Sequence, residues 1–273
     1  LGLHLQDGVL IASDVGAAVS AASRAGADAD ACCAAAAAAV TVVLTWMILD
    51  ETVTPEKRAA SQKHSRPQLG IREVYRNKSL VTLLVIVFGS QIGMARLQAT
   101  FALYGEAVLF SGEPAAVVQL GIGLLLATVG LGQIFTQLVL LKRVGQRFGD
   151  DMLVILGGIF RSLSMLVMIA VASPISAGAG IFLFAIGTGL QLPALQSLTT
   201  QVVDDSLRGG VLGVYQSVNS FAIISGSAVA GLLFAIGPRI PYLLSAVLFA
   251  LMVIPAYFVM NWHRQEQLAQ PTA

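Results

Sequence analysis

The sequence has few charged residues, and this shortage excludes an ordinary soluble protein. Only 11% of the 273 residues are charged, whereas 56% are hydrophobic. Soluble domains carry about 25% charged residues. A soluble core of this length could not enclose so much apolar surface, so we expect a lipid bilayer to cover it. The formal net charge of +1 gives no indication of a nucleic-acid partner.

Residue types that carry chemistry are also scarce. The two cysteines, Cys32 and Cys33, are adjacent, which offers neither a disulfide framework nor metal-ligand spacing. No histidine occurs between Leu80 and Asn261, no lysine occurs in an apolar segment, and the acids fall near segment ends or in loops. No group in the membrane could therefore activate a nucleophile or form a Schiff base. We expect no enzyme activity, no cofactor and no metal.

Apolar segments of membrane length account for most of the chain. Each can cross a bilayer core of about 30 Å, and turn residues separate them. We predict an all-α membrane protein with seven transmembrane helices: one over 31–50 and six in a bundle over 79–264. The six run over 79–108, 114–141, 151–172, 176–202, 208–236 and 240–261.

Three further segments complete the predicted organisation. Residues 1–30 form an irregular or partial segment to which we assign no function. Residues 51–78 form a polar, basic linker, and residues 265–273 form a short tail. The chain starts at Leu1 without a basic region before an apolar stretch, so we expect no signal peptide and a start that lies upstream.

Basic residues mark one side of the membrane. The linker 51–78, the connection 142–150, Arg208 and Arg264 all fall on the same side if the seven helices alternate, and the other side has only Arg239. Lys and Arg favour cytoplasmic loops. We therefore expect a multi-pass protein of the cell membrane, with the linker and the C-terminus in the cytoplasm.

Several stretches together resemble the major facilitator superfamily of transporters. Residues 137–149 resemble the short basic, glycine-containing loop in the C-terminal half of that family. Residues 207–220 resemble the start of the family's eleventh helix, and Leu49–Thr52 with the basic linker resemble the end of its sixth helix. The loop motif consists of Lys142, Arg143, Gly145, Arg147 and Gly149.

The resemblance covers about residues 31–264 and implies a fold. The family has twelve helices in two six-helix halves, so this chain would be helix six plus the C-terminal half. Its six-helix bundle would consist of two inverted three-helix repeats. The first five family helices, and the antiporter signature of the fifth, are not readable in residues 1–30.

The resemblance also implies a function. It favours secondary transport of a small molecule by alternating access, with efflux of the drug:proton antiporter type as the closest branch. The chain would supply one half of the transporter, and a missing N-terminal half or a partner bundle would supply the other. Two alternatives stay open: a seven-helix receptor or scaffold without transport activity, and a truncated fragment without function.

Polar residues on four of the predicted helices are candidates for the substrate cavity. These helices are the ones that line the cavity in the family, and each carries amide side chains. Hydrogen bonding between helices is the alternative role for every one of them. The candidates are Gln91, Arg96, Gln98, Gln133, Gln137, Gln191, Gln196, Tyr215, Gln216 and Asn219.

Two arginines lie within apolar segments, where insertion of an arginine costs about 2.5–3.5 kcal/mol. Arg96 either faces a water-filled cavity and attracts an anionic group of the substrate, or extends to the outer surface and pairs with Glu106. Because Arg96 lies nearly opposite Gln98 on a helix, the two cannot line one narrow wall. For Arg161 we expect a structural pair or an extended side chain that reaches the surface.

Overall fold

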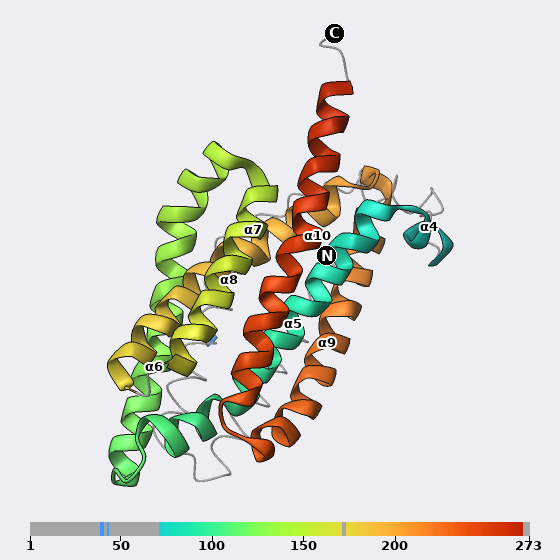
Figure 1. Ribbon diagram of the computed structural model, residues 1–273. Helices are drawn as coiled ribbons and strands as arrows, with labels where there is room; N and C mark the ends of the chain where they lie inside the picture. Colours follow the sequence, from blue (N-terminus) through green and yellow to red (C-terminus); the bar gives the residue numbers. More distant parts are fainter. Residues whose placement is uncertain (1–38, 41–42, 44–70, 171–172, 270–273) are drawn as a thin grey trace. The chain divides into compact units, whose positions relative to one another are not determined.

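The computed structural model describes residues 39–40, 43, 71–170 and 173–269 (Figure 1). The chain divides into two units, Leu1–Ser65 and Arg66–Ala273, and the helices from Ile71 onward belong to the second. The irregular segment 1–30, nearly all of the predicted helix 31–50, most of the linker and residues 270–273 lie outside the described residues. The regular structure of the described part is entirely helical.

Six long helices and several short ones make up the described part of this unit. The structure places a short helix, α4, within the stretch that the sequence indicated as linker. Two helices continue into five-residue π-helices, η1 and η2. The elements are α4 (Ile71–Arg76), α5 (Lys78–Tyr104), η1 (Gly105–Leu109), α6 (Ala115–Phe135), η2 (Thr136–Leu140), α7 (Leu141–Ala170), α8 (Pro174–Gln201), η3 (Asp205–Leu207), α9 (Arg208–Ile236) and α10 (Ile240–Ala269).

Five stretches in the described residues are long and apolar enough to cross a membrane. One of them, Ala115–Ala170, has 56 residues. At 1.5 Å per residue it would extend about 84 Å, far more than a bilayer core. The chain reverses within it at Gly149, whose φ of 76° and ψ of 169° suit only glycine (Figure 1). We therefore interpret this stretch as two membrane passes.

The basic connection before Gly149 differs from the loop that the sequence indicated. Residues 141–148 are helical and continue the preceding pass without a break. Lys, Arg and Gln are good helix formers, and only Gly149 departs from helical geometry. The turn is therefore confined to one residue.

The other helix ends follow local sequence signals. Pro114 and Pro174 stand at the starts of α6 and α8, where the missing N–H of proline leaves no hydrogen bond unmade. Asn77 caps α5 by accepting a hydrogen bond from the Leu80 amide at 3.1 Å, and its own amide donates to the Val202 carbonyl at 2.9 Å. This side chain therefore joins the start of α5 to the end of α8.

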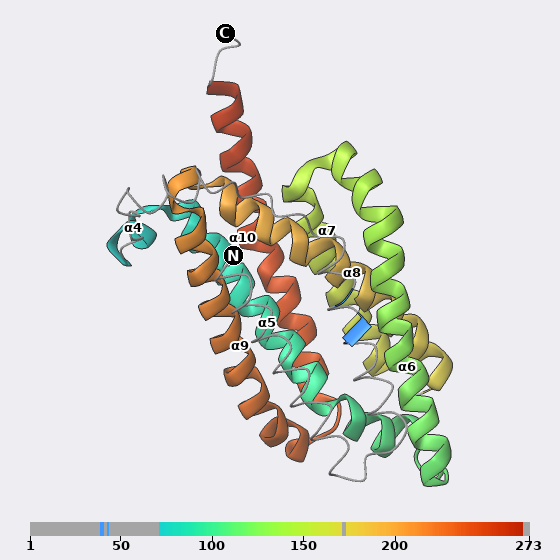
Figure 2. The same ribbon diagram turned by 180° about the vertical axis from the view of Figure 1, so that it is seen from behind.

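The helices pack in a small set of pairs. Helix α7 packs against α8 and α10, α5 packs against α9 and α10, and α6 packs against α8. Helix α10 crosses in front of α5 in Figure 1 and behind it in Figure 2. Helices α7 and α8 approach so closely that a Cβ atom on Gly157 would lie 2.6 Å from the Gly187 carbonyl oxygen.

Candidate functional site

Arg161 lies at the centre of the helix packing. Its side chain is 0% exposed, and its guanidinium donates to Gln191 Oε1 at 2.5 Å and to the Ser90 carbonyl oxygen at 2.8 Å. The guanidinium carbon also lies 4.1 Å from the ring centre of Phe249 and 5.2 Å from that of Phe184. Arg161 from α7 is therefore joined to α5, α8 and α10.

Glycines make the space for this arginine. A Cβ atom on Gly187 would lie 2.8 Å from Arg161 Cγ, so a larger residue there would displace the side chain. Gln191 is also held by α7, because its amide nitrogen donates to the Val154 carbonyl at 3.4 Å. Arg161 thus has structural partners, which is one of the two roles that the sequence suggested for it. These partners are an amide, a carbonyl and two aromatic rings.

A second polar contact joins α5 to α9. The Gln91 amide nitrogen donates to Asn219 Oδ1, which brings together two residues that the sequence indicated as cavity candidates. Gln91 Oε1 is buried and has no hydrogen-bond partner in the described part of the chain. Tyr215, one turn before Asn219, is buried in the same apolar core as Leu84 and Val87. These three candidates lie within the packing of α5 and α9.

Arg96 is almost as buried as Arg161 but has different surroundings. Its side chain is 8% exposed, and its Nε atom is buried without a hydrogen-bond partner. Among the described residues, no acid pairs with it, and Glu106 is exposed. The pair with Glu106 that the sequence suggested as one alternative is therefore not formed in this structure.

The direction of Arg96 follows from its neighbours on α5. Ile92, one turn earlier on the same face, lies against Gly226 of α9, and Gly93 lies against Phe249 of α10. Arg96 therefore lies on the side of α5 that faces α9 and α10. Gln98, two residues further on and about 200° around the helix, is exposed on another side.

The remaining glutamine candidates are more accessible. Four of them, on four different helical elements, are exposed, and Gln133 is half-buried. The exposed candidates are Gln98 on α5, Gln137 on η2, Gln196 on α8 and Gln216 on α9. Gln191 differs from this group because it is buried against Arg161. Whether any of these side chains contacts a substrate stays a prediction.

The loop motif lies at the chain reversal. Its basic side chains, Lys142, Arg143 and Arg147, are exposed, whereas Gly145 is half-buried near Leu153. Gly149 makes the turn itself. The motif therefore presents a positive surface next to a sharp reversal that requires glycine.

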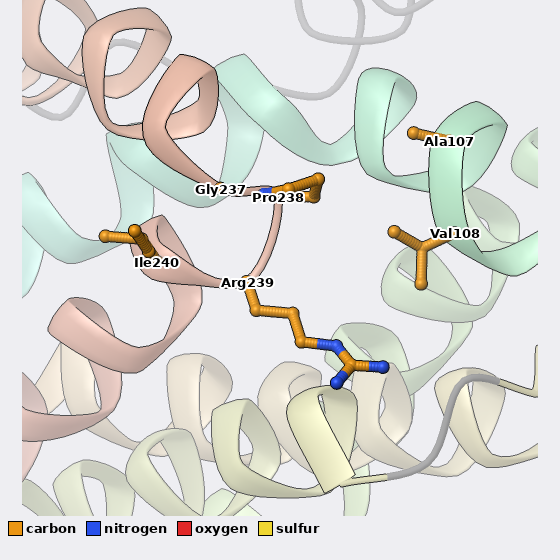
Figure 3. Close-up of a pocket in the computed structure, with 6 residues that line it drawn as sticks. All are labelled: Ala107, Val108, Gly237, Pro238, Arg239 and Ile240. Carbon is orange, nitrogen blue, oxygen red and sulfur yellow. The ribbon is translucent and has the colours of Figure 1, made fainter.

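A cavity of about 470 Å³ lies at the turn between α9 and α10, where sequence reasoning placed no site. Figure 3 shows Arg239 extending from this turn, with Ala107 and Val108 of η1 nearby. Arg239 is the only charged residue of the lining. Over the residues that the structure describes, no group of three or more His, Cys, Asp or Glu could hold a metal ion.

Comparison with known proteins adds independent information. The family profile described as Major Facilitator Superfamily matches residues 97–272, which is more than half of the chain. The protein named "Multi-drug resistance efflux pump PmrA homolog" from Lactococcus lactis subsp. lactis (strain IL1403) is 27% identical over 165 residues, covering 59% of this chain and 40% of that protein. "Tetracycline resistance protein, class H" from Pasteurella multocida is 25% identical over 209 residues, covering 75% of this chain and 48% of that protein. The chain thus spans about half the length, or less, of these relatives.

Proposed function

Because the chain belongs to the major facilitator superfamily, we propose that it forms one of the two helical bundles of a transporter that exports small molecules. In this proposal the two bundles move against each other around a central site, and the site opens to each side of the membrane in turn. The protein moves its substrate without converting it chemically.

The packing pairs support a bundle built from two inverted repeats. Take α5, α6 and α7 as one repeat and α8, α9 and α10 as the other. Exchanging the repeats turns the α7–α8 pair into α10–α5, and the α5–α9 pair into α8–α6, while α7–α10 maps onto itself. Each of these pairs is present. A two-fold relation between three-helix repeats would produce this pattern.

The observation that carries the proposal is the exposure of amide side chains inside apolar helices. Gln98, Gln196 and Gln216 lie in three different membrane helices and are exposed in this unit. An amide that faces hydrocarbon without a hydrogen-bond partner costs several kcal/mol. A water-filled cavity or a second bundle beside these side chains would remove that cost.

The names of the relatives favour efflux of drug-type molecules. One relative is named as a multi-drug resistance efflux pump and the other as a tetracycline resistance protein. We therefore expect amphiphilic, ring-containing compounds as the first substrates to test. Exposed glutamines suit such substrates, because an amide both donates and accepts hydrogen bonds and does not select one charge.

An efflux assay tests the proposal. The full-length transporter, with this chain and the bundle that completes it, is expressed in cells that lack their own drug pumps. The cells are loaded with a fluorescent dye, and dye loss is followed after energy is supplied. We expect energy-dependent loss of dye, slowed at least threefold by Gln98→Ala or Gln216→Ala. Gln119→Ala, at the exposed start of α6, is the matched control and should leave the rate unchanged.

The same assay separates the alternatives. A receptor or scaffold, or a fragment without function, would give no energy-dependent loss of dye although the protein is present in the membrane. Dye export that is insensitive to both cavity substitutions would leave transport in place but would remove the exposed glutamines from the site.

A further inference from the structure

The Arg161 guanidinium has more N–H groups than hydrogen bonds among the described residues. An arginine side chain carries five N–H groups. The structure gives it two oxygen acceptors, Gln191 Oε1 and the Ser90 carbonyl. The rings of Phe184 and Phe249 cover the guanidinium without accepting an ordinary hydrogen bond. Nε is buried without a partner in the described part of the molecule.

Two further buried hydroxyl groups belong to Ser90, whose carbonyl bonds this guanidinium, and to Thr188, which follows the Gly187 that lies against Arg161. Ser90 is 0% exposed and Thr188 is 1% exposed, and both hydroxyl oxygens are buried without a hydrogen-bond partner among the described residues. The Ser90 carbonyl is already bonded to Arg161. On α8, Thr188 follows Phe184 by four residues and precedes Gln191 by three. These spacings place all three side chains on one face of the helix.

The charge of this centre is also uncompensated. No acid in the described residues pairs with Arg161, and the nearest acids along α7, Asp150 and Asp151, lie at its turn, about 15 Å away at 1.5 Å per residue. A buried cation without a counter-charge is strongly unfavourable. Water could satisfy the donors, but it would leave the positive charge unchanged.

We infer that a small monovalent anion of halide size binds beside Arg161, held by Arg161 Nε–H and by the hydroxyl groups of Ser90 and Thr188. All three groups can donate hydrogen bonds to it, and the guanidinium supplies the opposite charge. The site is distinct from the exposed glutamines, and it does not depend on the proposed transport function.

The position of this site has a consequence for stability. The anion is enclosed by α5, α7, α8 and α10, so it binds the packed bundle and not the separated helices. A ligand that binds only the folded state raises the unfolding temperature, and its stabilising free energy grows as RT ln(1 + L/Kd), where L is the ligand concentration. The bundle should therefore be more stable in halide than in a salt of a large anion that cannot enter.

Thermal unfolding of the purified protein in detergent provides the first test, with sodium bromide compared with sodium gluconate at equal ionic strength. We expect bromide to raise the unfolding temperature by about 3 °C when it is present well above its Kd. Thr188→Val and Ser90→Ala should each reduce this shift to less than half. Thr199→Val is the matched control, because the buried Thr199 hydroxyl already donates to the Leu195 carbonyl at 2.6 Å.

The direct test is anomalous scattering from crystals grown in bromide. A bromide peak within hydrogen-bond distance of Arg161 Nε is the expected result. Density there without an anomalous signal would identify water and overturn the inference. Equal unfolding temperatures in the two salts, or a bromide shift that survives in the Ser90→Ala, Thr188→Val double variant, would overturn it as well.

Discussion

Arg161 and Arg96 are both buried arginines within apolar helices, and they differ in what surrounds them. Arg161 is bonded to an amide and a carbonyl and lies against two rings. Arg96 has a buried Nε without a partner in the described residues and lies on the side of α5 facing α9 and α10. Both Nε atoms are buried without a partner among the described residues, but only the Arg161 guanidinium is bonded to facing helices through its other two nitrogens.

The two helix contacts explain the difference. Around Arg161, Gly157 and Gly187 let the α7 and α8 backbones touch, so that short distances link the guanidinium to its acceptors. Near Arg96, α9 approaches through Gly226, but its neighbouring side chains are apolar or small. A close glycine contact together with acceptors on the facing helices therefore gives Arg161 the hydrogen bonds that Arg96 lacks.

Arg161→Ala should have the largest effect. The change removes two hydrogen bonds and two ring contacts and leaves a space among four helices. We expect a loss of about 3–5 kcal/mol in the free energy of unfolding. Thermal or denaturant unfolding in detergent measures it, and a loss below 1 kcal/mol would show that the guanidinium does not hold the helices together.

Gly187→Ala should be the next largest change. Its Cβ atom would meet the Gly157 carbonyl oxygen at 2.7 Å and Arg161 Cγ at 2.8 Å, so α7 and α8 must separate. We expect a loss of about 1–3 kcal/mol by the same measurement. Gly130→Ala is the control, because no atom lies within 4 Å of that position, and it should leave stability unchanged or slightly higher.

Arg96→Met should act in the opposite direction to Arg161→Ala. It removes a donor that no described residue satisfies, while keeping the apolar length of the side chain. We expect stability to stay the same or to rise by about 1–3 kcal/mol, within the insertion cost of arginine. A loss of more than 1 kcal/mol would indicate that Arg96 has a partner in the folded protein.

The contact between Gln91 and Asn219 should give the smallest effect. A double-mutant cycle with Gln91→Leu and Asn219→Leu isolates its energy. Hydrogen bonds between membrane helices contribute about 0.6 kcal/mol on average, and we expect a coupling energy of that size. A coupling energy above 2 kcal/mol would mean that this contact links its helices as strongly as the Arg161 hydrogen bonds link theirs.

Several ends of the described helices agree with the ranges that the sequence indicated. Proline and glycine mark their ends: α9 spans the expected 208–236, and α8 begins at Pro174, two residues before the expected start. The connection before Gly149 was less predictable, because its basic residues suit both an exposed loop and a helix. Only the backbone geometry shows that the reversal occurs at one glycine.

The partners of the polar residues could not be predicted in the same way. Gln191 and Gln196 both flank Pro193, yet one is buried against Arg161 and the other is exposed. Periodicity gives the face of a helix but not the helix that it meets. The hydrogen bond from Arg161 of α7 to the Ser90 carbonyl of α5, 71 residues away in the chain, therefore could not be predicted from the sequence.

The most direct test compares two double-mutant cycles in one preparation of the protein. One combines Arg161→Met with Gln191→Leu, and the other combines Arg96→Met with Glu106→Gln. Because hydrogen bonds to charged groups contribute about 1.5–3 kcal/mol, we predict a coupling energy in that range for Arg161 with Gln191. We predict a coupling near zero for Arg96 with Glu106. The reverse order would contradict the conclusion that Arg161 is bonded to Gln191 on the facing helix whereas Arg96 forms no pair with Glu106.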